Sequence, residues 1–219
     1  MPLHPLGICR SRDVARAPET LRAGSAVARW SRENELACAW LEPAARPLEP
    51  LEHAAAVAAI HRHICVLPMR FGIAAAEEGP LRSLLRARRE ELLERLDCLE
   101  GAGEMALRIA VPRPIGPPVV SSATSAPQAY FQRRRAHYRQ RDEADDRYRA
   151  VEQRFLERLR GVYRDWRRLP DSALDLLRLT FLVAREQTDA FRARLADHCG
   201  TDRAGGCLIL GPWPPYSFV

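Results

Sequence analysis

The amino-acid sequence predicts an α+β fold made of two small α+β domains, over residues 1–102 and 103–219. Segments with apolar side chains at every second residue alternate with segments in which they recur every three or four residues, as strands and helices do. A stretch rich in proline and serine, at 112–127, has the composition of an extended loop. At 219 residues, the chain is long enough for one large core or two small ones.

The first elements predicted are a pair of strands followed by a helix. Ala26–Trp30 and Glu35–Leu41 are short apolar stretches separated by the polar, turn-like segment Ser31–Asn34, which favours a hairpin. Prolines then interrupt regular structure until the alanine-rich segment Leu51–His63, which predicts a helix.

The middle of the chain predicts a strand, a helix and a second strand. The sequence ICVLPMRFG, which ends at Gly72, indicates a short buried strand, and Pro68 places it at a sheet edge or a bulge. Leucines at spacings of three and four predict one amphipathic helix from Pro80 to just before Gly101. The alternating sequence MALRIAV, Met105–Val111, is typical of a half-buried strand.

The second half continues with helical and extended segments in turn. Residues 128–168 predict a long helix or a helical hairpin, and Leu176–Val183 alternates as a strand. Glu186–His198 is helical in pattern, and Cys207–Gly211 is a last strand. The order strand, helix, strand, helix, strand is that of an α+β sandwich related to the ferredoxin-like type, so the C-terminal domain is predicted as a modified ferredoxin-like arrangement.

The charge and hydropathy of the chain indicate a folded protein of the cytoplasm. All 34 basic residues are arginines, and 28 acids are interspersed with them, which favours a solvated surface of ion pairs. No apolar run reaches the ~18 residues that a membrane helix needs. The first residues lack the pattern of a secretory signal, so we expect a cytoplasmic location and no membrane partner.

The sequence offers no convincing metal site or disulfide framework. The six cysteines are scattered without a C-x-x-C pair, and in a reducing compartment we expect them to be small buried hydrophobes. His61, His63 and Cys65 alternate but lack a fourth ligand nearby, so we interpret them as structural. No cofactor is expected.

No motif for catalysis is present, and one basic cluster suggests a partner surface. The chain contains no G-x-S-x-G, glycine-rich phosphate loop or H-E-x-x-H, so we expect neither an enzyme nor a small-molecule substrate. Arg133, Arg134 and Arg135 lie near Tyr130 and could bind nucleic acid, but acids follow at once, which favours an acidic protein partner. A nucleic-acid-binding adaptor using this arginine-rich helix is the alternative hypothesis.

The last residues, GPWPPYSFV, are the most unusual local feature. Three prolines remove backbone donors, while three aromatic side chains offer large surfaces for burial. We expect an extended edge piece fixed by its aromatic rings rather than by a hydrogen-bond ladder. Its distinctive residues are Gly211, Pro212, Trp213, Pro214, Pro215, Tyr216 and Phe218.

This ending resembles the C-terminus of the GvpL/GvpF family of gas vesicle proteins. The sequence VLPMRFG resembles the central motif of the family and follows a helix that carries His53 in a matching place. YFQRRRA, Tyr130–Ala136, and FLVAREQTDAF resemble two later family segments, whereas the opening LGIC departs from the tyrosine-rich first strand of the family. The central-motif residues that carry the resemblance are Leu67, Pro68, Arg70, Phe71 and Gly72.

The resemblance implies a two-domain α+β protein that takes part in gas vesicle formation without catalysis. Gas vesicles are gas-filled shells made mainly of the small protein GvpA, and family members are implied to bind it and other accessory proteins during nucleation or assembly. The candidate partner-binding residues are Tyr130, Arg133, Arg134 and Arg135. For Arg70, an internal bond to a carboxylate or chain terminus is the favoured interpretation, with a partner contact as the alternative.

Overall fold

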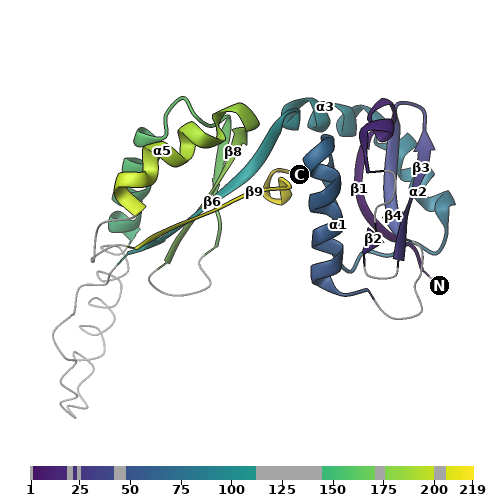
Figure 1. The fold of residues 1–219 in the computed structure, drawn as a ribbon, viewed down its shortest axis with the longest axis horizontal. Coiled ribbons are helices and arrows are strands. Elements are labelled where there is room, and N and C mark those ends of the chain that lie inside the picture. The colour runs from purple at the N-terminus through teal and green to yellow at the C-terminus, as the bar shows by residue number, and fades with distance from the viewer. Residues whose placement is uncertain are drawn as a thin grey trace, which may run out of the picture.

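The computed structural model describes residues 2–18, 22–23, 26–41, 48–111, 145–170, 176–199 and 206–219. They form two lobes that meet at one end and diverge at the other (Figure 1). The first lobe is built on a five-stranded sheet and the second on a four-stranded sheet. The predicted α+β class is confirmed.

The five-stranded sheet is antiparallel throughout, with the order β2-β3-β4-β1-β5. The predicted hairpin is present, but its first strand is longer than expected and the turn comes later, at Asn34, whose φ of 51° lies in the left-handed region that asparagine tolerates. The predicted edge strand at Pro68 is confirmed, because it pairs with only one neighbour. The strands are β1 (His4–Arg10), β2 (Arg22–Ala23), β3 (Ala26–Glu33), β4 (Leu36–Leu41) and β5 (Leu67–Pro68).

Helices cover both faces of this sheet. The predicted alanine-rich helix is α1 (Pro50–His63), which packs on one face together with the 3-10 turn η1 (Ser11–Arg16). On the other face lie α2 (Glu78–Ala87) and α3 (Arg89–Leu99). Since both faces are covered, all six residues of β4 are buried.

The single helix predicted from Pro80 onward is wrong, because the chain breaks at Arg88. This residue leaves the helical conformation, with φ −113° and ψ 24°. Its guanidinium forms two hydrogen bonds with Glu91 in the first turn of α3, at 2.8 and 2.6 Å. The leucine spacing did not reveal the break, because leucines on both sides of it still point to one core.

The four-stranded sheet has the order β7-β8-β6-β9, and all its pairs are antiparallel. Its strands are β6 (Ala102–Ala110), β7 (Asp165–Arg168), β8 (Leu176–Ala184) and β9 (Cys207–Trp213). A helix over 145–158 precedes β7, and the 3-10 turn η2 (Arg185–Gln187) leads from β8 into α5 (Thr188–Cys199). The resulting order of strand, helix, strand, strand, helix, strand confirms the ferredoxin-like arrangement.

The helix predicted to reach Arg168 ends earlier, within the described residues. Helical structure stops at residue 158, Gly161 adopts a φ of 84°, and Trp166 lies on β7. Apolar residues spaced by four fit a strand at their far end as well as a helix, so periodicity could not locate this boundary. The predicted loop at 112–127 lies outside the described residues.

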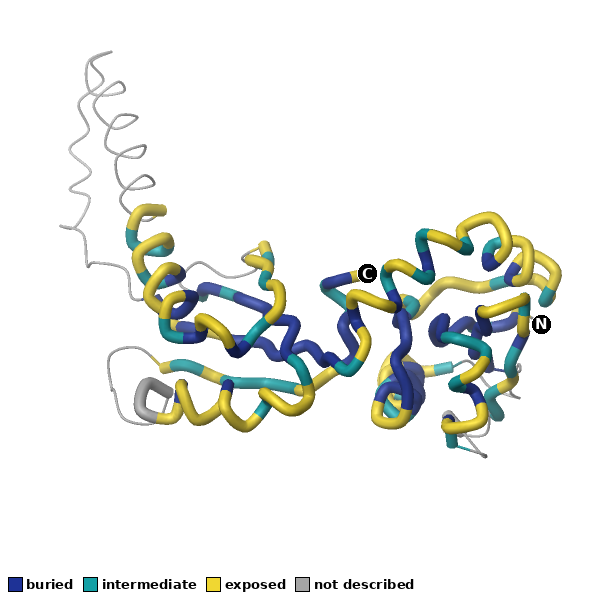
Figure 2. The backbone as a smooth tube through the Cα atoms, turned by 90° about the horizontal axis from the view of Figure 1, so that it is seen from above, coloured by how far each residue is buried: buried dark blue, intermediate teal, exposed yellow. Residues whose placement is uncertain are grey.

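Helices cover only one face of the second sheet. Met105, Leu107 and Phe181 point to that face and are fully buried against the helix over 145–158 and α5. Phe181 makes edge-to-face contacts with Tyr163 and Phe191, with ring centroids 5.2 and 5.4 Å apart. Along β6, burial is continuous near the first lobe and then alternates (Figure 2). The strand is therefore covered on both faces near the first lobe and on one face farther away.

The cysteines differ from the expectation in two places. Cys9, Cys38 and Cys65 are free and buried, and burial raises the pKa of the Cys38 and Cys65 thiols to about 12. Cys98 is free but exposed. Cys207 forms a disulfide, so the expectation of reduced cysteines throughout is wrong there.

The division into domains at residues 102 and 103 stays a prediction. That boundary falls at the start of β6, which runs from the end of α3 into the second sheet. The last residues of the described chain, from Pro214, return to the place where the two lobes meet (Figure 1). Their contacts define the candidate site.

Candidate partner-binding site

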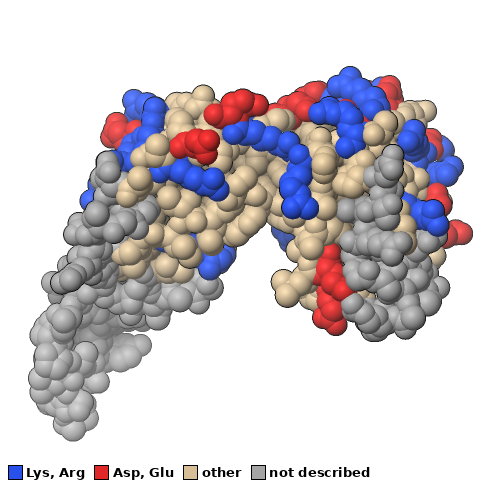
Figure 3. All heavy atoms as spheres, viewed as in Figure 1, with Lys and Arg blue, Asp and Glu red and all other residues tan. Residues whose placement is uncertain are grey.

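A hollow opens between the two lobes below the place where they meet, and Figure 3 shows it on one face of the molecule. We call the meeting place the junction; it comprises the end of α1, the start of β6 and residues 214–219. One wall of the hollow is α1, and the other is the sheet face that α5 and the helix over 145–158 leave uncovered (Figure 1). Much of the hollow on this face is uncharged, while arginines gather above the junction (Figure 3).

An arginine of the second lobe caps a helix of the first at the junction. Arg185, which follows β8, donates hydrogen bonds to the carbonyl oxygens of His61 and Arg62 at the end of α1. The last carbonyls of a helix have no partner within it and carry the negative end of the helix dipole, so a guanidinium suits this position. Burial, and then the nearby Arg185 charge, lowers the pKa of His61 to about 4.

A buried carboxylate holds the C-terminal segment in place. Glu104 on β6 accepts hydrogen bonds from the backbone N–H and the hydroxyl of Ser217, both at 2.8 Å. Burial raises the pKa of the Glu104 carboxyl, and the Ser217 bonds and Arg167 act in the opposite direction. The guanidinium of Arg167 also lies over the ring of Phe218, 5.2 Å from its centroid.

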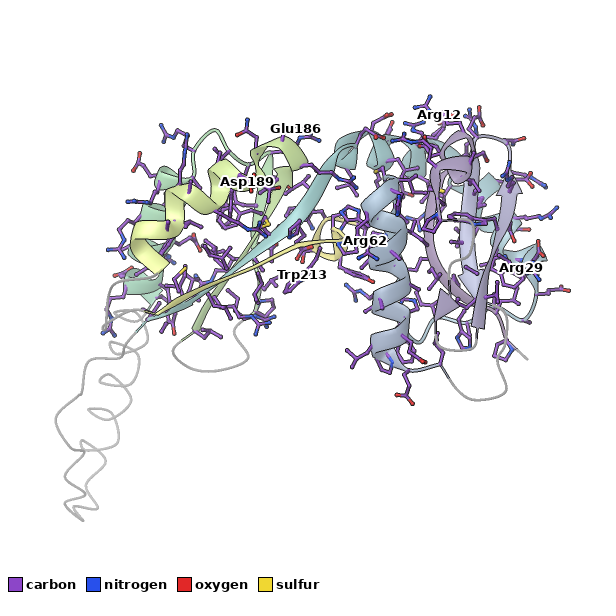
Figure 4. All side chains as sticks on the ribbon, viewed as in Figure 1. Arg12, Arg29, Arg62, Glu186, Asp189 and Trp213 are labelled. Atoms are coloured by element: carbon purple, nitrogen blue, oxygen red, sulfur yellow. The ribbon has the colours of Figure 1, made fainter. Side chains whose placement is uncertain are left out.

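The C-terminal segment is fixed by hydrogen bonds as well as by rings, contrary to the expectation. β9 pairs with β6 as far as Trp213, with a shift in register between Ala106 and Glu104. The side chain of Trp213 is 41% exposed rather than buried. Figure 4 shows Trp213 and Arg62 on facing sides of the gap between the lobes. Pro214 and Pro215 are buried, and the turn η3 (Tyr216–Phe218) follows them.

The two remaining aromatic rings of the segment join the cores of the first lobe. Phe218 belongs to the core beneath α2 and α3, together with Leu182 of β8. Tyr216 packs against the other core, beneath α1. Residues at the end of the described chain thus connect both cores of the first lobe to the second sheet.

Gly211 permits the bend that brings β9 to the junction. Its φ is 108°, and a Cβ there would lie 2.5 Å from the Glu104 carbonyl oxygen. Any other residue would collide with β6 and adopt a strained backbone conformation. The peptide bond between Gly211 and Pro212 is cis.

The central motif lies in the first lobe, at the edge strand β5, and links three elements. Leu67 and Pro68 form β5, and the backbone N–H of Met69 donates to the Leu6 carbonyl oxygen at 2.9 Å. Phe71 is 45% exposed and packs edge-on against His53, whose ring donates a hydrogen bond to the Pro5 carbonyl oxygen at 3.1 Å.

Two other residues of the motif are exposed. Gly72 has a φ of 92°, which explains the glycine. Arg70 makes no hydrogen bond or ion pair with any described residue. Its predicted role thus stays a prediction, and an internal carboxylate partner for it is absent from the described part of the chain.

The uncovered sheet face carries apolar residues and arginines. Arg108 of β6 stands directly opposite Arg178 of β8 on one side and Leu208 of β9 on the other. Leu210 lies opposite Ala106 on the same face, and Leu208 is 52% exposed. Like charges directly opposite each other on a sheet are unfavourable unless something neutralises them.

The facing wall is the outer surface of α1. Leu51, Ala54, Ala55 and Arg62 are exposed there, while the opposite side of the helix is buried in the first lobe. At the end of this helix, the Nδ1 atom of His61 is buried without a partner.

The described residues include no cluster of three histidine, cysteine or acidic side chains that could hold a metal. The thiol of Cys65 instead donates to the Leu96 carbonyl oxygen at 3.6 Å. No helix in the described part of the chain is long and apolar enough to span a membrane. The candidate residues Tyr130, Arg133, Arg134 and Arg135 lie outside the described residues.

Sequence reasoning missed Glu104, Arg185 and the pair of Arg108 and Arg178. An acid at the start of an apolar strand could have drawn attention to Glu104. The arginine pair depends on strand register, which periodicity does not specify between distant segments.

Comparison with solved structures shows that this two-lobed fold is similar to that of gas vesicle proteins. The structure of GvpF from Anabaena sp. PCC7120 superposes with a TM-score of 0.77 at 18% identity, over 99% of this chain and 95% of that one. GvpF from Microcystis aeruginosa gives 0.73 at 14% identity, over 99% and 98% of the two chains.

Sequence comparison gives the family. The model of the gas vesicle synthesis protein GvpL/GvpF family matches residues 15–219. Gas vesicle protein F of Streptomyces sp. (strain CB03234) is 30% identical over 169 residues, which are 70% of each chain. The chain belongs to the GvpL/GvpF family of gas vesicle proteins, and the predicted family is confirmed.

Proposed function

We propose that this protein takes part in the nucleation or assembly of gas vesicles by binding the shell protein GvpA and other accessory proteins. The observation that carries this proposal is the match of the family model over residues 15–219. The junction supports it, because a junction held by Arg185, Glu104 and Phe218 gives the hollow a defined shape. A preorganised surface binds a partner at lower entropic cost than a loose one.

The proposed role is binding rather than catalysis, in the cytoplasm and at the gas vesicle. Two groups with perturbed pKa values have structural roles among the described residues: Glu104 holds Ser217, and His61 lies at the end of a helix that Arg185 caps. The cluster of Tyr130, Arg133, Arg134 and Arg135 remains a proposed second contact surface.

Capture of purified GvpA by the immobilised full-length protein tests the proposal. Binding that persists from low to high salt supports docking through apolar and backbone contacts. Trp213→Ala is the informative tail variant, because Trp213 is exposed whereas Phe218 belongs to a core. No capture of GvpA at either salt concentration would overturn the proposal.

The nucleic-acid alternative gives a different result in the same experiment. Binding of RNA or DNA that weakens steeply with salt, and falls on mutation of Arg133–Arg135 to glutamine, would favour the adaptor hypothesis.

A further inference from the structure

The uncovered face of the second sheet carries exposed leucine and arginine side chains, a composition suited to binding an amphipathic helix. It is formed by alternate residues of β6, β8 and β9, since their neighbours in sequence fill the core beneath the helices. We call it the open face and define it by Arg108, Arg178, Leu208 and Leu210; Ala106, on the same side of the sheet, is buried.

The same molecule shows what such a face accepts. The opposite side of this sheet is covered by two helices, and both sides of the first-lobe sheet are covered by helices. A sheet buries an apolar face most simply by packing a helix layer on it. Leu208, exposed at 52%, and Leu210 offer the apolar ridge for another helix.

The charges of the open face indicate that its partner is negatively charged. Arg108 makes no hydrogen bond or ion pair with any described residue, and the bond that the structure shows for Arg178 goes to the Pro170 carbonyl oxygen, at 3.4 Å. Other arginines do find acids: Arg86 pairs with Glu33 at 2.8 Å, and Arg10 pairs with Asp97. Two opposed arginines without a described counter-ion need an anionic neighbour.

A buried hydroxyl lies on the same side of the sheet, beyond the exposed part of the open face. Thr180 lies opposite Ala106 on β6 and Arg167 on β7, so it shares the side of the open face. It is 1% exposed, and its hydroxyl has no hydrogen-bond partner within the described structure. Buried hydroxyls usually find a partner, which makes this position unusual.

We propose that the open face binds an amphipathic helix of the shell protein, with its apolar side on Leu208 and Leu210 and its carboxylates against Arg108 and Arg178. This inference rests on the proposed function and adds the surface and the chemistry of recognition. The helix would give the second sheet the two-sided covering that the first sheet already has.

Charge reversal at the exposed Arg108 tests the inference on the full-length protein. Arg108→Glu is compared with Arg12→Glu, a matched reversal on the first lobe, far from the open face (Figure 4). We expect Arg108→Glu to raise the Kd for GvpA at least tenfold and Arg12→Glu to leave it unchanged, since a reversed interfacial charge repels the partner. Leu208→Glu should act like Arg108→Glu, and circular dichroism confirms that all three variants are folded.

The outcomes separate this inference from the proposed function. If wild type binds GvpA and both open-face variants bind as well as wild type, the inference about the open face is overturned while the proposed function stands. If wild type does not bind, both fail. If the protein instead binds RNA in a salt-sensitive way and Arg108→Glu abolishes that binding, the open face binds nucleic acid rather than a helix, and the inference is overturned.

Hydrogen exchange distinguishes a helix on the open face from a strand added to the sheet edge. β9 is an edge strand, so an added strand would protect its outward amides. A helix on the face leaves those amides exchanging at nearly their free rate. Strong protection of the outward amides of β9 in the complex would contradict a helical partner.

Discussion

The first-lobe sheet has helices on both faces, whereas the second-lobe sheet has helices on one. The difference appears in single strands: β4 is buried at every position, while the distal part of β6 alternates between buried and exposed residues. A sheet that is covered twice has both of its apolar faces buried. A sheet that is covered once has a face available for recognition, and this is the face on which we propose that the partner helix binds.

The largest expected effect separates the two faces of the second sheet. Phe181→Ala on the covered face should lower the free energy of unfolding by about 3–5 kcal/mol, because it leaves a cavity among Tyr163 and Phe191. Leu208→Ala on the open face should cost under about 1 kcal/mol. Urea denaturation measures both, and equal losses would show that the open face is covered in the free protein.

The next effect tests how the lobes are joined. Phe218→Ala should lower the free energy of unfolding by about 2 kcal/mol or more, because it removes a ring from a core of the first lobe. The same ring contacts Arg167 of the second lobe. Amide exchange at the start of β6 should rise as well. Val219→Ala is the control at an exposed neighbour, and an unchanged stability for Phe218→Ala would argue against the junction as a structural link.

An acid-dependent effect follows from His61 at the junction. Its pKa is about 4 in the folded protein against 6.5 as the reference value, so between these pH values the unfolded state binds more protons. Stability from this group is therefore present above pH 6.5 and is lost as pH falls towards 4, by about 2–3 kcal/mol in total.

Comparison with His61→Gln isolates this loss from other titrating groups. Chemical denaturation between pH 7.5 and 4 should show wild type losing stability relative to the variant. Parallel pH profiles would contradict the assignment. Glu104 works with the opposite sign, because its raised pKa makes its contribution fall as pH rises.

The smallest effect is expected at the surface of the first lobe. Arg89 pairs with Glu35, and the hydrogen bond from Arg89 lowers the pKa of Glu35 to about 2, yet both groups are exposed. Exposed ion pairs are largely offset by solvation and side-chain entropy. Arg89→Gln should leave the Tm unchanged in thermal denaturation, and a clear drop would indicate a network that extends beyond the pair.

Much of this architecture could be predicted from local pattern. Alternation identified β6 and β8, alanine content identified α1, and Pro68 correctly indicated an edge strand. Elements whose boundaries depend on tertiary packing were missed, namely the break at Arg88 and the strand β7.

The candidate site was predictable only in part, for a physical reason. The distinctive GPWPPYSFV ending could be found because its composition is unusual, but the partner of Ser217 lies far away in sequence on β6. Register decides that Arg108 and Arg178 face each other, and no local periodicity encodes that pairing.

The position of Phe218 has a consequence for synthesis on the ribosome. Domains generally fold as units, the N-terminal one first as the chain emerges. A core of the first lobe includes Leu182 and Phe218, so that core cannot be completed until residue 218 has left the exit tunnel. Until then, the part of this core that the first lobe supplies lacks Leu182 and Phe218, so some of its apolar surface stays exposed. Completion of the first lobe thus waits for a residue that is translated after every strand of the second sheet.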